Sequence, residues 1–301
     1  MTASIVVGLG ELLWDLLPGG RLPGGAPANF AYHAAVLGDH GIVASRVGTD
    51  PPGEDICACL TAQGLTTHHV QRDPHRPTGT VQVQLEADGQ PRFTIAEDAA
   101  WDALAWNDDW AGLAAQADAV CFGALAQRSA ASRETIQRFL RATRPEAVRL
   151  FDVNLRQHYH TPDTVDISLR RATMAKLNDV ELRQVAHFLG LAVDPEAGEL
   201  ELARCLLQTY DLALVCLTRG ARGSLLVTEQ QAVSHPGFAV RVVSSVGAGD
   251  AFAAAVVHHW LRGASLTVIA EAANRLGAYV ATQAGGMPPV PATVLNQVWQ
   301  P

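Results

Sequence analysis

Lysine is nearly absent from this chain of 301 residues: 22 residues are lysine or arginine, and Lys176 is the single lysine among them. The Gly-Lys-Ser/Thr triplet of a P-loop occurs nowhere, so a nucleotide site of that type is excluded. The shortage also leaves little room for the lysine-dependent site of a protein kinase. We interpret Lys176 itself as a surface residue, together with Arg222 and the pair His68-His69.

Other absences narrow the class of protein. The five cysteines form no Cys-x-x-Cys pair, which indicates free thiols rather than a disulfide framework or a zinc site. The net charge of -8 argues against nucleic acid as a partner. No apolar run reaches membrane-spanning length, and no basic region precedes an apolar one at the start. We therefore expect a soluble, cytoplasmic protein with no membrane partner.

The residues that are present favour a large α/β protein. The chain is 48% apolar and 17% charged, enough to bury a sizeable core. Strands alternate with helices, most clearly after residue 100, which predicts one mostly parallel sheet covered by helices and a single domain over 1–301. The expected strands are 4–7, 42–47, 119–122, 148–153, 213–217 and 224–227, and the expected helices are 24–37, 54–63, 132–144, 249–262 and 266–281.

Two segments break this alternation. Residues 14–23 predict a short hairpin that turns at Pro-Gly-Gly. In residues 78–97, apolar and polar residues alternate up to an Asp88-Gly89 turn, which predicts a half-exposed hairpin. We expect the segments of about 11–24 and 78–97 to form a small β-sheet lid. An exposed lid edge also allows pairing into a homodimer.

The turn Gly247-Ala248-Gly249 leads directly into Asp250 and an apolar run of helical length. The first N–H groups of a helix lack internal partners and carry partial positive charge, so this turn is a ready anion site. Asp250 would repel an anion. It therefore acts either as a helix cap or as a base beside an anion hole.

Gly24 and Gly25 precede the predicted helix 24–37 and allow a ligand to approach the backbone closely. Asn29 can point its amide at that ligand or cap the helix. Further candidates follow predicted strands, where ligands of parallel sheets gather. Each also has a structural reading: a solvated carboxylate, a capped helix start or a Gly-rich connection. They are Asp15, Asn154, Arg156, Asn178, Glu181, Thr218, Gly220 and Gly223.

Four of these elements occur in the order found in one family. Residues 24–29 (GGAPAN) and 247–252 (GAGDAF) resemble the two signatures of the ribokinase/PfkB carbohydrate kinases, and Asn178-x-x-Glu181 and 217–223 lie between them. The resemblance covers nearly the whole chain. It implies a ribokinase-like three-layer fold with a β-lid, and transfer of the γ-phosphoryl group of Mg-ATP to a sugar hydroxyl.

The resemblance also implies roles. Asp250 becomes the catalytic base, and Gly247, Ala248 and Gly249 supply the anion hole. An aspartate of ordinary pKa, about 3.9, is a poor base for an alcohol, so the proton should move late. The implied nucleotide contacts are Asn178, Thr218, Gly220, Gly223 and Asn274, and Glu181 is implied to hold Mg²⁺ indirectly.

For the substrate, the opening residues 10–15 and 24–31 look most like bacterial fructokinases, and Asp152-x-Asn154-x-Arg156 suits the branch that acts on ketoses or keto-sugar acids. The implied sugar contacts are Asp15, Gly24, Gly25, Asn29, Phe93, Asn154 and Arg156, with Phe93 over the apolar face of the sugar. The alternatives are a kinase for 2-keto-3-deoxygluconate, ribose or a nucleoside, or a catalytically silent sensor of sugar or nucleotide.

One departure concerns a further cofactor. Ser244-Ser245 stand where the family usually has Asp-Thr, and in many members that Asp helps to hold a monovalent cation. Ser244 has no charge to offer. A monovalent cation is therefore the one cofactor that the resemblance leaves in doubt.

Overall fold

A nine-stranded sheet forms the centre of the computed structural model, which describes residues 3–17, 19–85, 91–191, 194 and 197–300. The strand order is β13-β12-β11-β10-β9-β8-β1-β4-β5; only β12 and β13 run antiparallel to their neighbours. The strands are β1 (Ile5–Leu9), β4 (His40–Gly48), β5 (Val70–Asp73), β8 (Ala119–Gly123), β9 (Val148–Asp152), β10 (Met174–Asn178), β11 (Leu214–Thr218), β12 (Ser224–Val227) and β13 (Ala232–His235).

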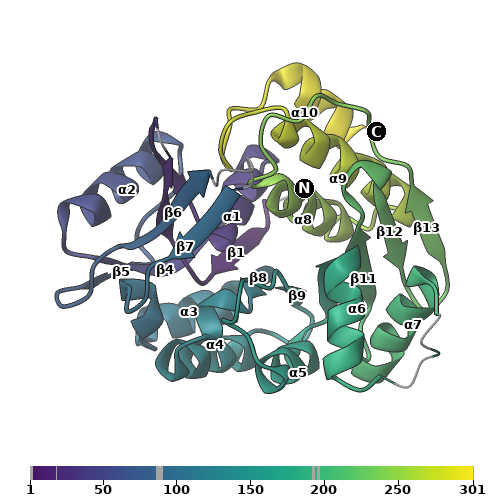
Figure 1. Cartoon of the computed structure of the whole chain (residues 1–301), viewed down its shortest axis with the longest axis horizontal. Helices are drawn as coiled ribbons and strands as arrows, with labels where there is room; N and C mark the ends of the chain where they lie inside the picture. Colours follow the sequence, from purple (N-terminus) through teal and green to yellow (C-terminus); the bar gives the residue numbers. More distant parts are fainter. Residues whose placement is uncertain (1–2, 18, 86–90, 192–193, 195–196, 301) are drawn as a thin grey trace.

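Helices cover both faces of this sheet (Figure 1). Each face carries its own large apolar cluster, because the strands of a parallel sheet are buried on both sides. One face holds α1 (Ala26–Val36), α8 (Ala248–Trp260), α9 (Leu266–Ala281) and α10 (Ala292–Trp299); the other holds α3 (Asp108–Gln116), α4 (Ala130–Ala142), α5 (Pro162–Arg171), α6 (Asp179–Phe188) and α7 (Glu199–Tyr210). The three-layer expectation is confirmed.

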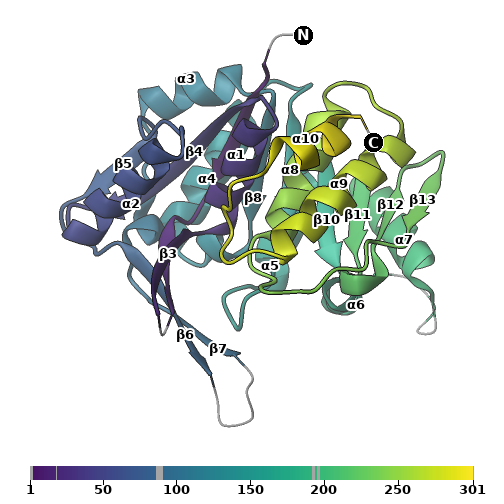
Figure 2. The ribbon, with the colours of Figure 1, turned by 90° about the horizontal axis from the view of Figure 1, so that it is seen from above.

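A second sheet of four strands projects from the body in Figure 2. Its order is β3-β2-β6-β7, with β2 (Leu13–Leu17), β3 (Gly20–Gly24), β6 (Gly79–Leu85) and β7 (Pro91–Ile95). These strands come from the two segments expected to form a lid, and helix α2 (Pro51–Ala62) packs beside β2. The Asp88-Gly89 turn lies outside the described residues.

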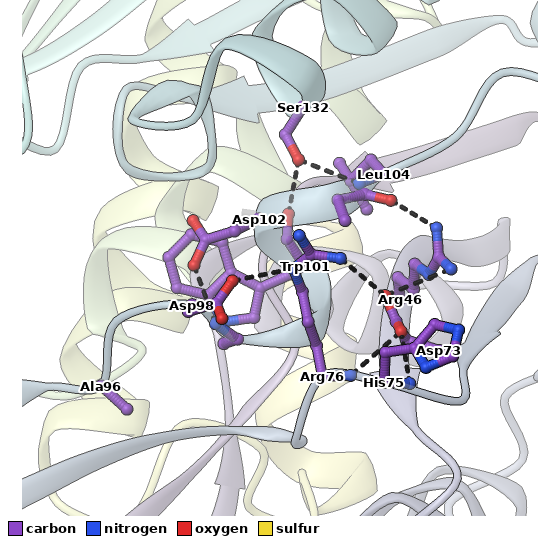
Figure 3. A network of polar contacts seen from close by, with 12 residues as sticks. Arg46, Asp73, His75, Arg76, Ala96, Asp98, Trp101, Asp102, Leu104 and Ser132 are labelled. Atoms are coloured by element: carbon purple, nitrogen blue, oxygen red, sulfur yellow. Dashed lines mark hydrogen bonds and ion pairs between the residues drawn. The ribbon is translucent and has the colours of Figure 1, made fainter.

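A polar network fixes the two chain segments that enter and leave this lid (Figure 3). The Asp73 carboxylate accepts the backbone N–H groups of His75 and Arg76 at 2.9 and 3.0 Å, and it pairs with Arg46 at 3.2 Å. Arg76 in turn pairs with Asp98 at 2.8 Å. The connection from β5 to β6 is thereby tied to the connection that follows β7.

The central helices of the site begin close to where the sequence pattern places them. The expected helix 249–262 is α8 at Ala248–Trp260, and the expected helix 266–281 is α9 at Leu266–Ala281. Strand β10 was not among the expected strands, although Asn178 at its end was a candidate. Within the described ranges, no helix combines the length and the apolar character needed to cross a membrane.

Candidate active site

The glycine turn before α8 is built by close backbone packing. Gly247 is the N-cap with φ 79°, a left-handed conformation that favours glycine, and an added Cβ there would collide with Gly286 in the loop after α9. The first α8 residue whose N–H bonds to the N-cap carbonyl is Ala251, at 2.9 Å to Gly247. The Ala248 N–H makes only a long hydrogen bond of 3.4 Å, to the Ser245 carbonyl, so this helix start still suits an anion.

Asp250 lies buried in the first turn of α8, 9% exposed. The Asn29 Nδ2 donates a hydrogen bond of 2.8 Å to its Oδ2. Burial, followed by the charge of Asp152, raises the pKa of Asp250 to about 6, while Lys176, Asn29 and Arg156 oppose that rise. The N-cap of α8 is Gly247, three residues before Asp250, and the Asp250 carboxylate accepts its hydrogen bond from Asn29 of another helix. The helix-cap alternative therefore does not describe this carboxylate.

Asn29 does not cap its helix either. The N-cap of α1 is Gly25, with φ 107° and no side-chain capping bond, and Asn29 lies on the inner side of the first turn. Its Oδ1 is buried without a hydrogen-bond partner, and an added Cβ on Gly286 would lie 2.5 Å from the amide. One end of the Asn29 amide thus holds Asp250, and the other end is buried with no hydrogen-bond partner in the described part of the chain.

Glu11 is a site residue that the sequence interpretation missed. It lies two residues after the end of β1, is 3% exposed, and its Oε2 is buried without a partner. Burial raises the pKa of Glu11 to about 7, with Asp250 adding to the rise and Arg156 opposing it. An acidic residue at the carboxyl end of a strand was the available signal. Gly25 is needed beside it, because an added Cβ would collide with the Glu11 carbonyl.

The lid contributes a third carboxylate. Asp15 lies on β2 opposite Leu22, and an added Cβ on Gly24 would collide with its Oδ2. Burial raises the pKa of Asp15 to about 6, and the charge of Arg156 opposes that rise. The exposed Arg156 thus acts electrostatically on Asp15, Glu11 and Asp250 together.

The remaining sugar-side candidates are less defined. Asn154 follows β9 with φ 39°, a left-handed conformation that asparagine tolerates better than most residues. It precedes Arg156 at the same edge of the sheet. Phe93 belongs to β7, but its side chain lies outside the described residues, so its place over the sugar stays a prediction.

On the nucleotide side, Asn178 and Glu181 form a capping box at the start of α6. Asn178 Oδ1 accepts the Glu181 N–H at 2.8 Å, and Glu181 Oε2 accepts the Asn178 N–H at 2.9 Å. Glu181 Oε1 accepts the Leu155 N–H at 2.9 Å. Burial raises the pKa of Glu181. The geometry is that of a capped helix start, the structural alternative for this motif.

The other nucleotide-side candidates also have roles within the fold. Thr218 Oγ1 donates to the Leu177 carbonyl at 3.3 Å. Gly223 has φ 78° where an added Cβ would collide with the His235 carbonyl, and Gly220 has φ 56° with open space around it. Asn274 is buried and its Nδ2 donates to Ser224 Oγ and to the Ala270 carbonyl at 2.6 and 2.7 Å, which joins α9 to β12.

The interpretation of Lys176 as a surface residue is wrong. It is 7% exposed on β10, and its Nζ lies 2.9 Å from both carboxylate oxygens of Asp152. A lysine is buried this deeply only when it is paired, and the partner lies on the neighbouring strand. Arg222 is exposed as expected, and the side chains of His68 and His69 are 71% and 13% exposed.

An α/β sheet with a glycine-built helix start, a buried carboxylate beside it and a small second sheet is the arrangement expected of a phosphotransferase. Residues 19–293 match the family described as pfkB family carbohydrate kinase. The chain belongs to this family, and it is a sugar kinase.

The chain is also similar over nearly its whole length to individual members. It is 30% identical over 300 residues to a fructokinase of Vibrio alginolyticus, covering 94% of each chain. An uncharacterized sugar kinase of Pyrococcus horikoshii in complex with ATP has a TM-score of 0.82 at 26% identity, covering 98% of this chain and 100% of the other. A fructokinase of Vibrio cholerae O395 with fructose, ADP and calcium bound has a TM-score of 0.81 at 25% identity, covering 98% and 99%.

Proposed function

We propose that this sugar kinase transfers the γ-phosphoryl group of ATP to a hydroxyl of D-fructose, with Asp250 as the base. The observation that carries the proposal is the position of Asp250: its carboxylate is buried in the first turn of α8, directly after the glycine turn, and bonds to Asn29 of α1. Fructose is supported by the relatives named as fructokinases, among them the Vibrio cholerae enzyme with fructose bound.

In the proposed reaction, Asp15 on the lid, Asn29 and Arg156 orient the sugar over Asp250, with Gly24 and Gly25 allowing close approach. The acceptor oxygen forms a bond to the γ-phosphorus while the bond to the bridging oxygen of ADP breaks. The hydroxyl proton passes to Asp250. The N–H groups of Gly247, Ala248 and Gly249 donate to the oxygens of the moving phosphoryl group. A pKa near 6 makes Asp250 a better base than an ordinary aspartate.

We assign Glu181 to Mg²⁺ through water rather than by direct contact. Each of its oxygens already accepts a backbone N–H, from Leu155 and from Asn178. Each oxygen keeps one lone pair that can accept a hydrogen bond from a water ligand of the ion, and Mg²⁺ usually keeps several of its waters in proteins. When bound, the ion neutralises charge on the ATP phosphates. The residues that would line the nucleotide are Asn178, Thr218, Gly220 and Gly223. Asn274 bonds to Ser224 and Ala270, so we assign it an indirect role in which it supports the nucleotide site from behind.

A coupled assay of ADP release over a panel of sugars tests the proposal. The panel contains fructose, 2-keto-3-deoxygluconate, ribose and a nucleoside, each with ATP and Mg²⁺. We expect the highest kcat/KM with fructose. Faster turnover of another acceptor would overturn the assignment of the sugar, and no turnover with any acceptor would support a silent sensor instead.

A further inference from the structure

The only lysine of the chain lies directly beneath the glycine turn. The parallel register of β9 and β10 places Lys176 opposite Asp152, and the Nζ is 2.9 Å from each oxygen of that carboxylate. The ammonium group is also close to α8, because an added Cβ on Gly249 would lie 3.1 Å from it. Lys176 is therefore a buried cation at the place where the proposed reaction handles an anion.

Stability does not explain such a pair. Removing two charges from water costs about as much as their attraction returns, and apolar residues of the same volume often serve a core equally well. Lys176 and Asp152 are 7% and 3% exposed, in a sheet whose neighbouring residues are apolar. Their position against Gly249 and Asp250 offers a different reason for keeping them charged.

Several charged groups act electrostatically on Asp250, and they come from three strands of the large sheet or the residues that follow them. Glu11 follows β1, Asp152 ends β9, Arg156 follows that strand, and Lys176 lies on β10. Of the two cations, Arg156 is exposed and Lys176 is buried. Without Lys176, the carboxylates of Asp152 and Asp250 would share one buried region, and one of them would hold a proton.

We propose that Lys176 is a positioning residue of the kinase site: held by Asp152 against Gly249, its ammonium group keeps Asp250 ionised and places a buried positive charge beneath the N–H groups that receive the phosphoryl group. This inference rests on the proposed roles of Asp250 and of the glycine turn, and it adds a cation to them. The carboxylates of Asp152, Asp250 and Glu181 outweigh the effect of burial and raise the pKa of Lys176, so the ammonium form persists across the working range of pH.

The first test removes the cation alone. Lys176→Met leaves Asp152 unpaired beside Asp250, so we expect the acid limb of the pH dependence of kcat/KM to move up by about one pH unit or more. We also expect kcat at the new optimum to fall about 100-fold, the effect of losing one group that stabilises the transferring charge. Arg170→Met removes an equal charge from the exposed surface of α5 and should leave both values unchanged. An unmoved acid limb in folded Lys176→Met would overturn the first half of the proposal.

The second test removes both charges, which also covers the case in which the single variant fails to fold. Asp152→Leu combined with Lys176→Met removes the ion pair as a whole, so neither partner stays buried without the other, and such replacements are commonly neutral or stabilising. We expect wild-type thermal stability and an acid limb near that of the wild type, because Asp250 then faces neither group. The value of kcat should stay about 100-fold low, since the positive charge is gone. A double variant with wild-type kcat would show that the pair is structural only and would overturn the second half.

The third test measures the NMR signal of the Lys176 ammonium group. Because the chain has a single lysine, labelling with [ζ-15N]lysine gives one side-chain signal in an NMR spectrum. We expect this signal to shift when a non-hydrolysable ATP analogue with Mg²⁺ is added at saturation, with binding verified by calorimetry. An unshifted signal would show that the ammonium group of Lys176 does not sense the bound phosphates, which would contradict the proposal. Absence of turnover with every sugar would contradict the proposed function instead, and this binding measurement does not depend on turnover.

Discussion

Two groups of polar residues lie along the same edge of the large sheet, and they differ in how many of their hydrogen-bonding atoms have a partner. Around Asp250, two buried oxygen atoms have no partner, Asn29 Oδ1 and Glu11 Oε2. Around α6, Asn178 and Glu181 bond to each other, and the remaining Glu181 oxygen accepts a backbone N–H. The first group has acceptors that the described residues leave unused, whereas the carboxylate and cap of the second are used within the fold.

The difference suggests separate roles for the two groups. We expect side chains around Asp250 to take part in the reaction, and the backbone around α6 to contribute to nucleotide binding. A buried polar atom without a partner costs about 1–3 kcal/mol, so two of them in one cluster point to groups that a ligand supplies. In the capping box of Asn178 and Glu181, the groups that could bind a ligand are already used in hydrogen bonds within the fold. Its main contribution to a nucleotide site would be to fix the start of α6. We therefore expect substitutions near Asp250 to change turnover and substitutions near Asn178 to change mainly stability and nucleotide affinity.

The largest effect should follow loss of the base. Asp250→Asn keeps the shape and the contact with Asn29 but cannot accept a proton, so we expect kcat to fall about 1,000-fold or more while ATP binding is retained. Steady-state kinetics and calorimetry measure the two quantities. The matched control is Asp166→Asn on the surface of α5, which should leave kcat unchanged. Near-normal turnover of Asp250→Asn would remove Asp250 from the role of base.

A second carboxylate beside the first should have the next largest effect. Asn29→Asp places a carboxylate where an amide now donates to Asp250 at 2.8 Å, so the two acids would share a proton. We expect kcat/KM at pH 7 to fall about 100-fold and the acid limb to move to higher pH. Asn107→Asp is the control, because Asn107 caps α3 through its oxygen and aspartate caps as well. An unmoved acid limb in Asn29→Asp would contradict the contact.

The raised pKa of Asp250 also predicts a dependence of stability on pH. Its folded pKa, about 6, lies above the ordinary 3.8, so the ionised group destabilises the fold above pH 6, and the cost disappears as the pH falls toward 3.8. Asp250→Asn should therefore raise the free energy of unfolding by about 3 kcal/mol at pH 8 and by much less at pH 4. Urea unfolding at both values measures this. Equal changes at the two pH values would show that the gain does not come from ionisation.

The smallest effect on turnover is expected on the nucleotide side. Asn178→Ala removes the cap of α6 and should lower the free energy of unfolding by about 1 kcal/mol. We expect KM for ATP to rise and kcat to change by less than about tenfold. Asn178→Asp keeps a capping oxygen and should restore stability. A loss of kcat as large as that of Asp250→Asn would erase the distinction between the two groups.

Local patterns were enough to predict much of this site. The turn at Gly247, the apolar run of α8 and the alternation in β6 depend on neighbours in sequence, and all three were predicted correctly, although Gly249 already lies in the first turn of α8. Asp250 was left between a cap and a base, because both uses begin at the same helix position. Only the contact with Asn29 separates them, and that contact joins residues 221 positions apart.

Long-range contacts explain what the patterns missed. In the sequence, Glu11 resembles any polar residue that follows a strand. Only the fold shows that it is buried and that its Oε2 has no partner. Lys176 looked like a surface lysine, because lysine is rarely buried and its partner is 24 positions away. The pairing depends on which strands lie side by side, and strand order is not encoded in either strand alone.

The sequence by itself determined the family, the three-layer class of fold, the glycine turn and the identity of the carboxylate that follows it. Backbone conformation and periodicity act over a few residues, and the family signatures are short. Only the tertiary structure decided that Asp250 is held by Asn29, that Glu11 is buried near it, and that the chain's single lysine lies against Gly249. Burial and charge pairing arise when distant strands and helices meet, which is where the properties of these side chains are set.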